Sequence, residues 1–300
     1  MISRSTVIGG LIVVELAIAG AAASALTGAG MASHNARTAM SSTPLDRTFV
    51  TGSAPRVVVD VQDVHVTVET AVSPSVRVVE TVLARGFMSG KPDAVVAEQT
   101  ADGIRVHSTG DGSLHVMIGE FNHELRLVVP PTARVQLATG GRIDAAGLRV
   151  KLVAHSSDGS IHVRDHQADL DVSTDSGRVE LVDVQGKAID ATSRDGRIYL
   201  TRVGADRLVA HSDSGRIVGS GIRAVDGSLT TADGRVIVSF TAGSDATALV
   251  HTGDGEISVA GFSSTDDGAS KRTVRLGSGR GHFEISTASG PITITQGANV

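Results

Sequence analysis

The stretch TADGRVIVSF, residues 231–240, places an Asp-Gly pair between a threonine and an alternating run of valine and isoleucine. Asp-Gly favours a tight turn, and apolar residues at every second position are typical of a strand that buries one face. Close variants of the phrase come before it: SSDGSIHV, TDSGRVEL, SRDGRIYL and SDSGRIVGS. The chain therefore repeats a short unit in which one strand ends, the chain turns and the next strand begins.

Aligning the phrases on the glycine that closes each turn reveals an internal repeat of 18 to 21 residues. The aligned glycines are Gly141, Gly159, Gly177, Gly196, Gly215, Gly234 and Gly255. Aliphatic residues predominate two and four positions after the glycine and five and seven positions before it, and from the second unit on a serine or threonine stands three positions before it. Because side chains alternate along a strand, each unit has an apolar face on both of its strands.

Strands this short must bury their apolar faces against other units. An antiparallel meander would leave one apolar sheet face uncovered, and no helix or second long segment supplies a cover. A solenoid closes the apolar face on itself, coil after coil. We therefore expect an all-β fold, a β-solenoid of 18–19-residue coils preceded by an N-terminal transmembrane helix, with residues 140–260 stacked in register.

The sequence predicts four segments along the chain. Residues 1–27 form a membrane anchor or signal segment, residues 28–55 a flexible linker, residues 56–130 a β-rich lead-in section, and residues 131–295 the solenoid repeats. The linker is rich in Gly, Ala, Ser and Thr, and the lead-in section shows alternating strands. Two glycine phrases near the end, at Gly281 and Gly290, are only nine residues apart and predict a closing hairpin that caps the last coil.

The N-terminal run from Val7 to Leu26 has 20 residues and a single charge, Glu15. Roughly 20 apolar residues suffice to cross a bilayer, so the run predicts an uncleaved membrane anchor. The small residues of AAASA near its end also fit a cleavable secretory signal. Either interpretation places the β domain outside the cytoplasm, anchored to the membrane in one case and secreted in the other.

Composition narrows the function classes. The chain has no cysteine, which excludes disulfides, thiol catalysis and Cys-based metal sites. The net charge of −5 and the absence of aromatic residues interleaved with basic patches argue against a nucleic-acid partner. Motifs of serine hydrolases, P-loop proteins and zinc peptidases are absent as well, so we expect no catalytic residues, no metal and no cofactor.

The repeat carries one basic column, directly after the turn glycine. Its members are Arg178, Arg197, Arg216 and Arg235. One interpretation is a ladder that binds an anionic glycan or another surface polymer. The other is a charge-balanced edge, in which the aspartates of the preceding turns offset the arginines.

Other polar columns have structural explanations. The serine or threonine of each unit is expected to point inward at a corner and to bond to the backbone or to the next hydroxyl. Three histidines, His155, His211 and His251, share a column with other coils between them, a spacing that does not bring metal ligands together.

A weak sign of carboxylate catalysis is the position of two aspartates. Asp171 and Asp190 fall at the same position of successive coils, with Asp169 near. Other residue types fill that column elsewhere, and no aromatic side chain stands by as a sugar platform.

The segment LRLVVPPTARVQLATGGRIDAAGL, residues 125–148, followed by the repeated glycine phrase, resembles the bacterial putative-adhesin family. The resemblance covers roughly residues 50–295, although the first coil has TGGRI in place of an acidic turn. It implies a β-strand-repeat domain of unknown function outside the cytoplasm, often behind a membrane segment, and it supplies no catalytic residues.

These observations lead to one expected function and two alternatives. We expect a non-catalytic extracytoplasmic interaction module, an adhesin or envelope-associated protein, whose partners are the membrane through the N-terminal helix and an envelope glycan or protein. The first alternative is a scaffold or accessory subunit of an envelope signalling system of the anti-sigma kind. The second is a carbohydrate-active enzyme.

Overall fold

The computed structural model describes residues 39–89, 93–110, 116–268 and 270–297. The predicted segment 1–27 and the first part of the predicted linker lie outside these residues. Within them, every regular element is a strand, and no helix has the length and apolar character needed to cross a membrane.

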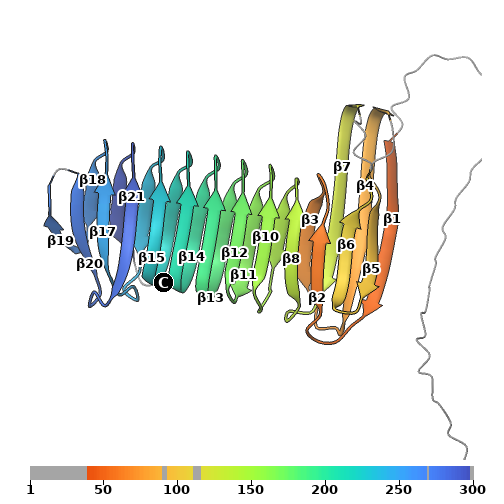
Figure 1. Ribbon diagram of the computed structural model, residues 1–300, viewed down its shortest axis with the longest axis horizontal. Coiled ribbons are helices and arrows are strands. Elements are labelled where there is room, and N and C mark those ends of the chain that lie inside the picture. Colours follow the sequence, from red (N-terminus) through yellow and green to blue (C-terminus); the bar gives the residue numbers. More distant parts are fainter. Residues whose placement is uncertain (1–38, 90–92, 111–115, 269, 298–300) are drawn as a thin grey trace, which may run out of the picture. The chain divides into compact units, whose positions relative to one another are not determined.

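The strands form one continuous stack (Figure 1), and in chain order they can be taken in three groups. The first group comprises β1 (Ala39–Val50), β2 (Arg56–Asp60), β3 (His65–Thr70), β4 (Ser75–Ser89), β5 (Val95–Thr100), β6 (Gly103–Ser108) and β7 (Val116–Val129). The second comprises β8 (Arg134–Thr139), β9 (Ile143–Ala146), β10 (Leu152–Ser156), β11 (Ile161–Gln167), β12 (Leu170–Thr174), β13 (Val179–Ser193), β14 (Ile198–Ser212) and β15 (Ile217–Thr231). The third comprises β16 (Val236–Phe240), β17 (Ala246–Thr252), β18 (Ile257–Ala260), β19 (Ser263–Asp266), β20 (Lys271–Leu276), β21 (Gly281–Thr287) and β22 (Ile292–Gln296).

The central strands stack as parallel, in-register coils, as the repeat predicts. The strands before the turn glycine follow the order β8, β10, β12, β13, β14 and β15, and those after it follow β9, β11, β13, β14, β15 and β16. Residues at the same position of the repeat are direct partners, such as Ile198 and Ile217. This parallel pairing excludes the antiparallel meander.

The core lies between the two walls of the stack. The aliphatic columns of the repeat supply it, with Leu200, Leu208 and Val238 at most 1% exposed. The valines at alternate positions of β2 and β3 are buried in the same way, so the core continues into the predicted lead-in section.

The coil of β2 and β3 is inserted out of sequence order. β2 lies between β6 and β8, and β3 lies between β7 and β9, all as parallel pairs. The predicted boundary at residue 130 therefore separates no structural units: residues 56–70 form the second coil of the stack, and β6 and β7 belong to the coil outside it.

The C-terminal end shows the same device and corrects the predicted closing hairpin. β21 is parallel to both β15 and β17, and β22 is parallel to both β16 and β18. Residues 281–296 thus form a complete coil between the coils of Gly234 and Gly255 (Figure 1). The cap at this end consists instead of two antiparallel strands: β20 pairs with β17, and β19 pairs with β20.

The predicted linker is shorter than expected. Residues Ala39–Val50 form β1, which pairs antiparallel with β4, and β4 pairs antiparallel with β7. The small and polar residues of this segment suggested a tether, but ten residues of β1 align with β4 as partners in an antiparallel pair. On the neighbouring wall, β5 pairs antiparallel with β6.

The corner at each turn glycine explains two columns of the repeat. Ser212 donates its hydroxyl hydrogen to the Gly196 carbonyl of the preceding coil at 3.0 Å and accepts a hydrogen bond from the Gly215 N–H at 2.9 Å. The same pair of bonds recurs around Thr231. This confirms that the Ser/Thr column is buried and bonded to backbone. The glycine is required because a Cβ at Gly215 would overlap the Gly196 carbonyl oxygen.

Candidate arginine column and its surroundings

The predicted basic column exists as a row of neighbouring side chains. The strands after the turn glycine pair in register from β13 to β16, and this places Arg178, Arg197, Arg216 and Arg235 on successive coils. All four side chains are exposed. At about 4.8 Å per coil, the four Cα atoms span about 14 Å along the stack.

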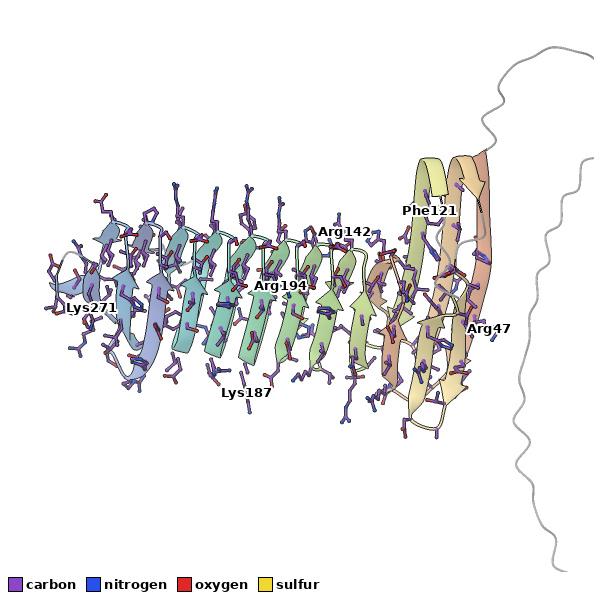
Figure 2. The ribbon with its side chains drawn as sticks, turned by 45° about the horizontal axis from the view of Figure 1, so that its top comes forward. Arg47, Phe121, Arg142, Lys187, Arg194 and Lys271 are labelled. Atoms are coloured by element: carbon purple, nitrogen blue, oxygen red, sulfur yellow. The ribbon has the colours of Figure 1, made fainter. Side chains whose placement is uncertain are left out.

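The column begins and ends at identifiable residues. Arg142 and Ser160 occupy the two coils before it, and Figure 2 shows Arg142 at the edge of the stack opposite Lys187. Beyond Arg235, the inserted coil contributes Pro291, and Glu256 comes one coil later. In the sequence repeat, Glu256 follows Gly255, the next aligned glycine after Gly234, and this predicts that Glu256 lies directly beside Arg235. The inserted coil separates the two residues.

The four arginines form no ion pair and no side-chain hydrogen bond with any other described residue. Other arginines do: Arg142 binds Asp144 with 2.7 Å between Nε and Oδ2, and Arg194 binds Asp175 with 3.3 Å between Nη2 and Oδ1. Arg202 forms two bonds with Asp183. The turn aspartates therefore form no direct ion pair with the column. Their charge offsets that of the arginines across solvent, as the interpretation as a charge-balanced edge expects.

Two further columns lie on the same outward face. Because alternate residues of a strand share a face, the residues two and four positions after each arginine stand beside it. Beside Arg197, Arg216 and Arg235 the first set contains Tyr199, Val218 and Ile237, all half-buried, and the second contains Thr201, Ser220 and Ser239. Beside Arg178 the same two positions hold Glu180 and Val182. The Arg178 guanidinium lies over the Tyr199 ring, 5.3 Å from its centroid. The repeat alignment contains both columns, but sequence reasoning followed only the charged one.

Towards the N-terminal end the same face is charged and already paired. Asp144 accepts hydrogen bonds from His65 and Arg142, with 2.6 Å between its Oδ2 and His65 Nε2. His162 bridges this pair to the next coil, with its Nε2 3.2 Å from Glu180 Oε2. Burial raises the pKa of the Asp144 carboxyl, but the bonds from His65 and Arg142 outweigh this and hold the pKa well below its usual range.

This polar cluster borders a surface depression of about 340 Å³. Sequence reasoning missed the cluster, since contact between His65 and Asp144 requires the inserted coil. Its groups already bond to one another, so they hold neighbouring coils together.

The remaining predicted sets are not assembled into a site. The histidines of the shared column have separate partners, such as Ser173 for His155 and Asp213 for His211. Among the described residues, no three side chains of metal-binding type are grouped closely enough to hold an ion.

The two aspartates that the sequence suggested as a carboxylate pair lie side by side. Asp171 and Asp190 are direct partners in adjacent strands. Burial raises the pKa of Asp190, and the neighbouring charge of Asp171 adds to this. Asp169 does not join them, because its Oδ1 accepts the backbone N–H groups of Lys187 and Ala188, at 3.0 Å each.

The fold and this face define a parallel β-solenoid with an exposed cationic column on one wall. Residues 57–295 match the family described as Toastrack DUF4097, and the chain belongs to that family. This confirms the resemblance seen in the sequence to a bacterial family with a domain of unknown function. No curated protein matches the chain.

Three solved structures resemble the chain. A putative adhesin from Bacteroides fragilis shares 12% identity at a TM-score of 0.49, covering 87% of this chain and 97% of its own. A putative adhesin from Parabacteroides merdae shares 13% at 0.44, covering 86% and 94%. A putative cell adhesion protein from Clostridium sporogenes shares 11% at 0.32, covering 84% and 99%.

Proposed function

We propose that the chain is a non-catalytic interaction module of the adhesin type, held outside the cytoplasm, whose arginine column contacts a component of the cell envelope. One observation carries the proposal: four exposed guanidinium groups stand in register on a rigid wall with no direct counter-charge among the described residues. Stacking fixes the spacing of the backbone positions that carry these charges, so a ligand with charges at the same spacing can contact all four arginines at once.

Binding of the purified full-length protein to bacterial envelope fractions tests this proposal. The test variant carries Arg178→Gln, Arg197→Gln, Arg216→Gln and Arg235→Gln. The matched control carries Arg56→Gln, Arg105→Gln, Arg134→Gln and Arg149→Gln. These are four exposed arginines near the N-terminal end, the first three on strands of the other wall and Arg149 in the turn before β10.

We expect the wild type and the control variant to bind envelope fractions and the test variant to bind much less. The proposal is wrong if the wild type binds no envelope fraction, or if both variants lose binding equally. Release of soluble sugars from these fractions, absent from a heat-denatured sample, would favour a carbohydrate-active enzyme instead.

A further inference from the structure

The outward face of β14–β16 carries three stripes that run along the stack, and the arginine stripe continues to Arg178 at the start of β13. We infer that this face binds a linear anionic polysaccharide lying across the strands, with its charged groups on the arginine column and its sugar rings on the stripe of Tyr199, Val218 and Ile237. The inference rests on the proposed function and names the ligand class for the same surface.

The three stripes follow one another in a fixed order across the strands. A cationic, an apolar and a hydroxyl-bearing residue follow one another at alternate positions of one strand, as in Arg197, Tyr199 and Thr201. The next two coils repeat the order: the apolar positions are direct partners throughout, and Thr201 is the direct partner of Ser220, whereas the register between β15 and β16 shifts after Gly219. A charged sugar has the matching groups: an acidic substituent, an apolar ring face and hydroxyls. Polyphosphate has only the first.

The spacing of the coils determines the direction in which the ligand lies. Each stripe advances by one coil, about 4.8 Å, which is close to the length of one sugar residue in a linear chain. A polysaccharide with one acidic group on each sugar therefore meets one arginine per residue when it lies along the stack. A chain along a strand would meet only a single arginine.

The surface ends at identifiable residues on each side. On the N-terminal side the apolar stripe ends at β13, where Glu180, beside Arg178, takes the position of Tyr199 and is bonded to His162 of the preceding coil. On the C-terminal side Pro291 ends the arginine column. The turn aspartates, including Asp213 and Asp233, are exposed beside the glycine corner and repel an anionic chain from that side. The bounded surface therefore accommodates about four charged sugars along the stack.

Titration of the full-length protein with oligogalacturonates of two, four, six and eight residues tests the inference, with fully methyl-esterified oligomers and polyphosphate as comparison probes. We expect affinity to rise with length up to about four residues and then to level off, and to fall with salt because bound counterions are released. The esterified oligomers should bind at least about tenfold more weakly, since charge-assisted bonds are roughly twice as strong as neutral ones.

Two variants separate the stripes. The fourfold Arg→Gln variant should lose binding, while the matched control should retain it. Tyr199→Ser should weaken oligogalacturonate binding by about tenfold and polyphosphate binding much less, because the sugar loses its aromatic platform whereas polyphosphate loses only the contact that holds Arg178 over the ring.

Three results would overturn the inference. They are equal binding of esterified and free oligomers, an equal loss in the control variant, and polyphosphate binding as tight as oligogalacturonate with no effect of Tyr199→Ser. If envelope fractions bind through the column and none of the acidic oligosaccharides does, the proposed function stands and this ligand class is wrong. If envelope fractions do not bind either, the failure lies with the proposed function.

Discussion

His166 occupies a core position that adjacent coils fill with aliphatic residues. Val184 is its direct partner on one side, and Leu148 holds the corresponding position on the other. The ring is 1% exposed, its Nε2–H donates to the Asp169 carbonyl at 3.2 Å, and its Nδ1 has no hydrogen-bond partner among the described residues. Burial lowers the pKa of His166, because the charged form is poorly solvated there.

This residue makes stability depend on pH in a definite direction. The unfolded chain binds a proton at the ordinary histidine pKa of about 6.5, and the folded chain binds it only at lower pH. Above pH about 6.5 the ring is neutral in both states, so its titration does not change the free energy of unfolding. As the pH falls below that value, the unfolded chain binds the proton more readily, and the free energy of unfolding decreases.

His166→Leu should stabilise the fold by about 1 kcal/mol at neutral pH, since it removes a buried polar atom without a partner. The gain should grow between pH 7.5 and 5.5, measured as the melting temperature of both proteins at each pH. His155→Leu, at an exposed strand position, is the control and should leave the pH dependence unchanged. Parallel pH profiles for His166→Leu and the wild type would contradict this account.

At the scale of the element, each coil is joined to the next through its glycine corner. Ser212→Ala removes a donor to the Gly196 carbonyl and an acceptor for the Gly215 N–H, both of which remain buried. We expect a loss of about 1 to 3 kcal/mol in the free energy of unfolding, the usual cost of unsatisfied buried groups. Urea denaturation measures it.

Ser214→Ala is the matched control for this corner. Ser214 is exposed on the same turn, and its hydroxyl donates only to Asp195 at 3.4 Å. The change should stay within about 0.5 kcal/mol of the wild type. Equal losses in the two variants would show that the corner bonds do not hold adjacent coils together.

The repeat could be predicted from sequence because each column has one physical cause. The glycine column follows from the close approach of the preceding carbonyl, and the Ser/Thr column from the corner bonds. The arginine column was found for the same reason, since one residue after an aligned glycine is a fixed place on the wall. What that column binds does not follow from spacing, because the neighbouring stripes matter as much as the charge.

The order of the end coils could not be predicted in this way. Residues 281–296 carry the same columns as every other coil, with Thr287 three positions before Gly290 and Ile292 two positions after it. Thr287 bonds to Gly234 and Thr252 bonds to Gly290, so identical chemistry serves both neighbours. Identical coils satisfy the same bonds in any order, and the two close glycines were therefore interpreted as a hairpin.

In the whole molecule, each inserted coil pairs with a neighbouring coil on both of its sides. The coil of β2 and β3 lies between the coil of β6 and β7 and the coil of β8 and β9. The coil of β21 and β22 lies between those of Gly234 and Gly255. In an ordinary solenoid each terminal coil contacts a single neighbour and is held least firmly. Here the last coil in the sequence has neighbours on both of its sides, like a central one.

Hydrogen exchange distinguishes these two situations. We expect the amides of β21 and β22 to exchange as slowly as those of β13 and β14, because each opens only when two flanking coils also open. β19, an exposed strand paired only with β20, should exchange fastest among the strands of this end. Fast exchange throughout β21 and β22 would show that insertion between two coils adds no protection. Slow exchange there would mean that the chain stabilises its C-terminal end by placing its last coil inside the stack.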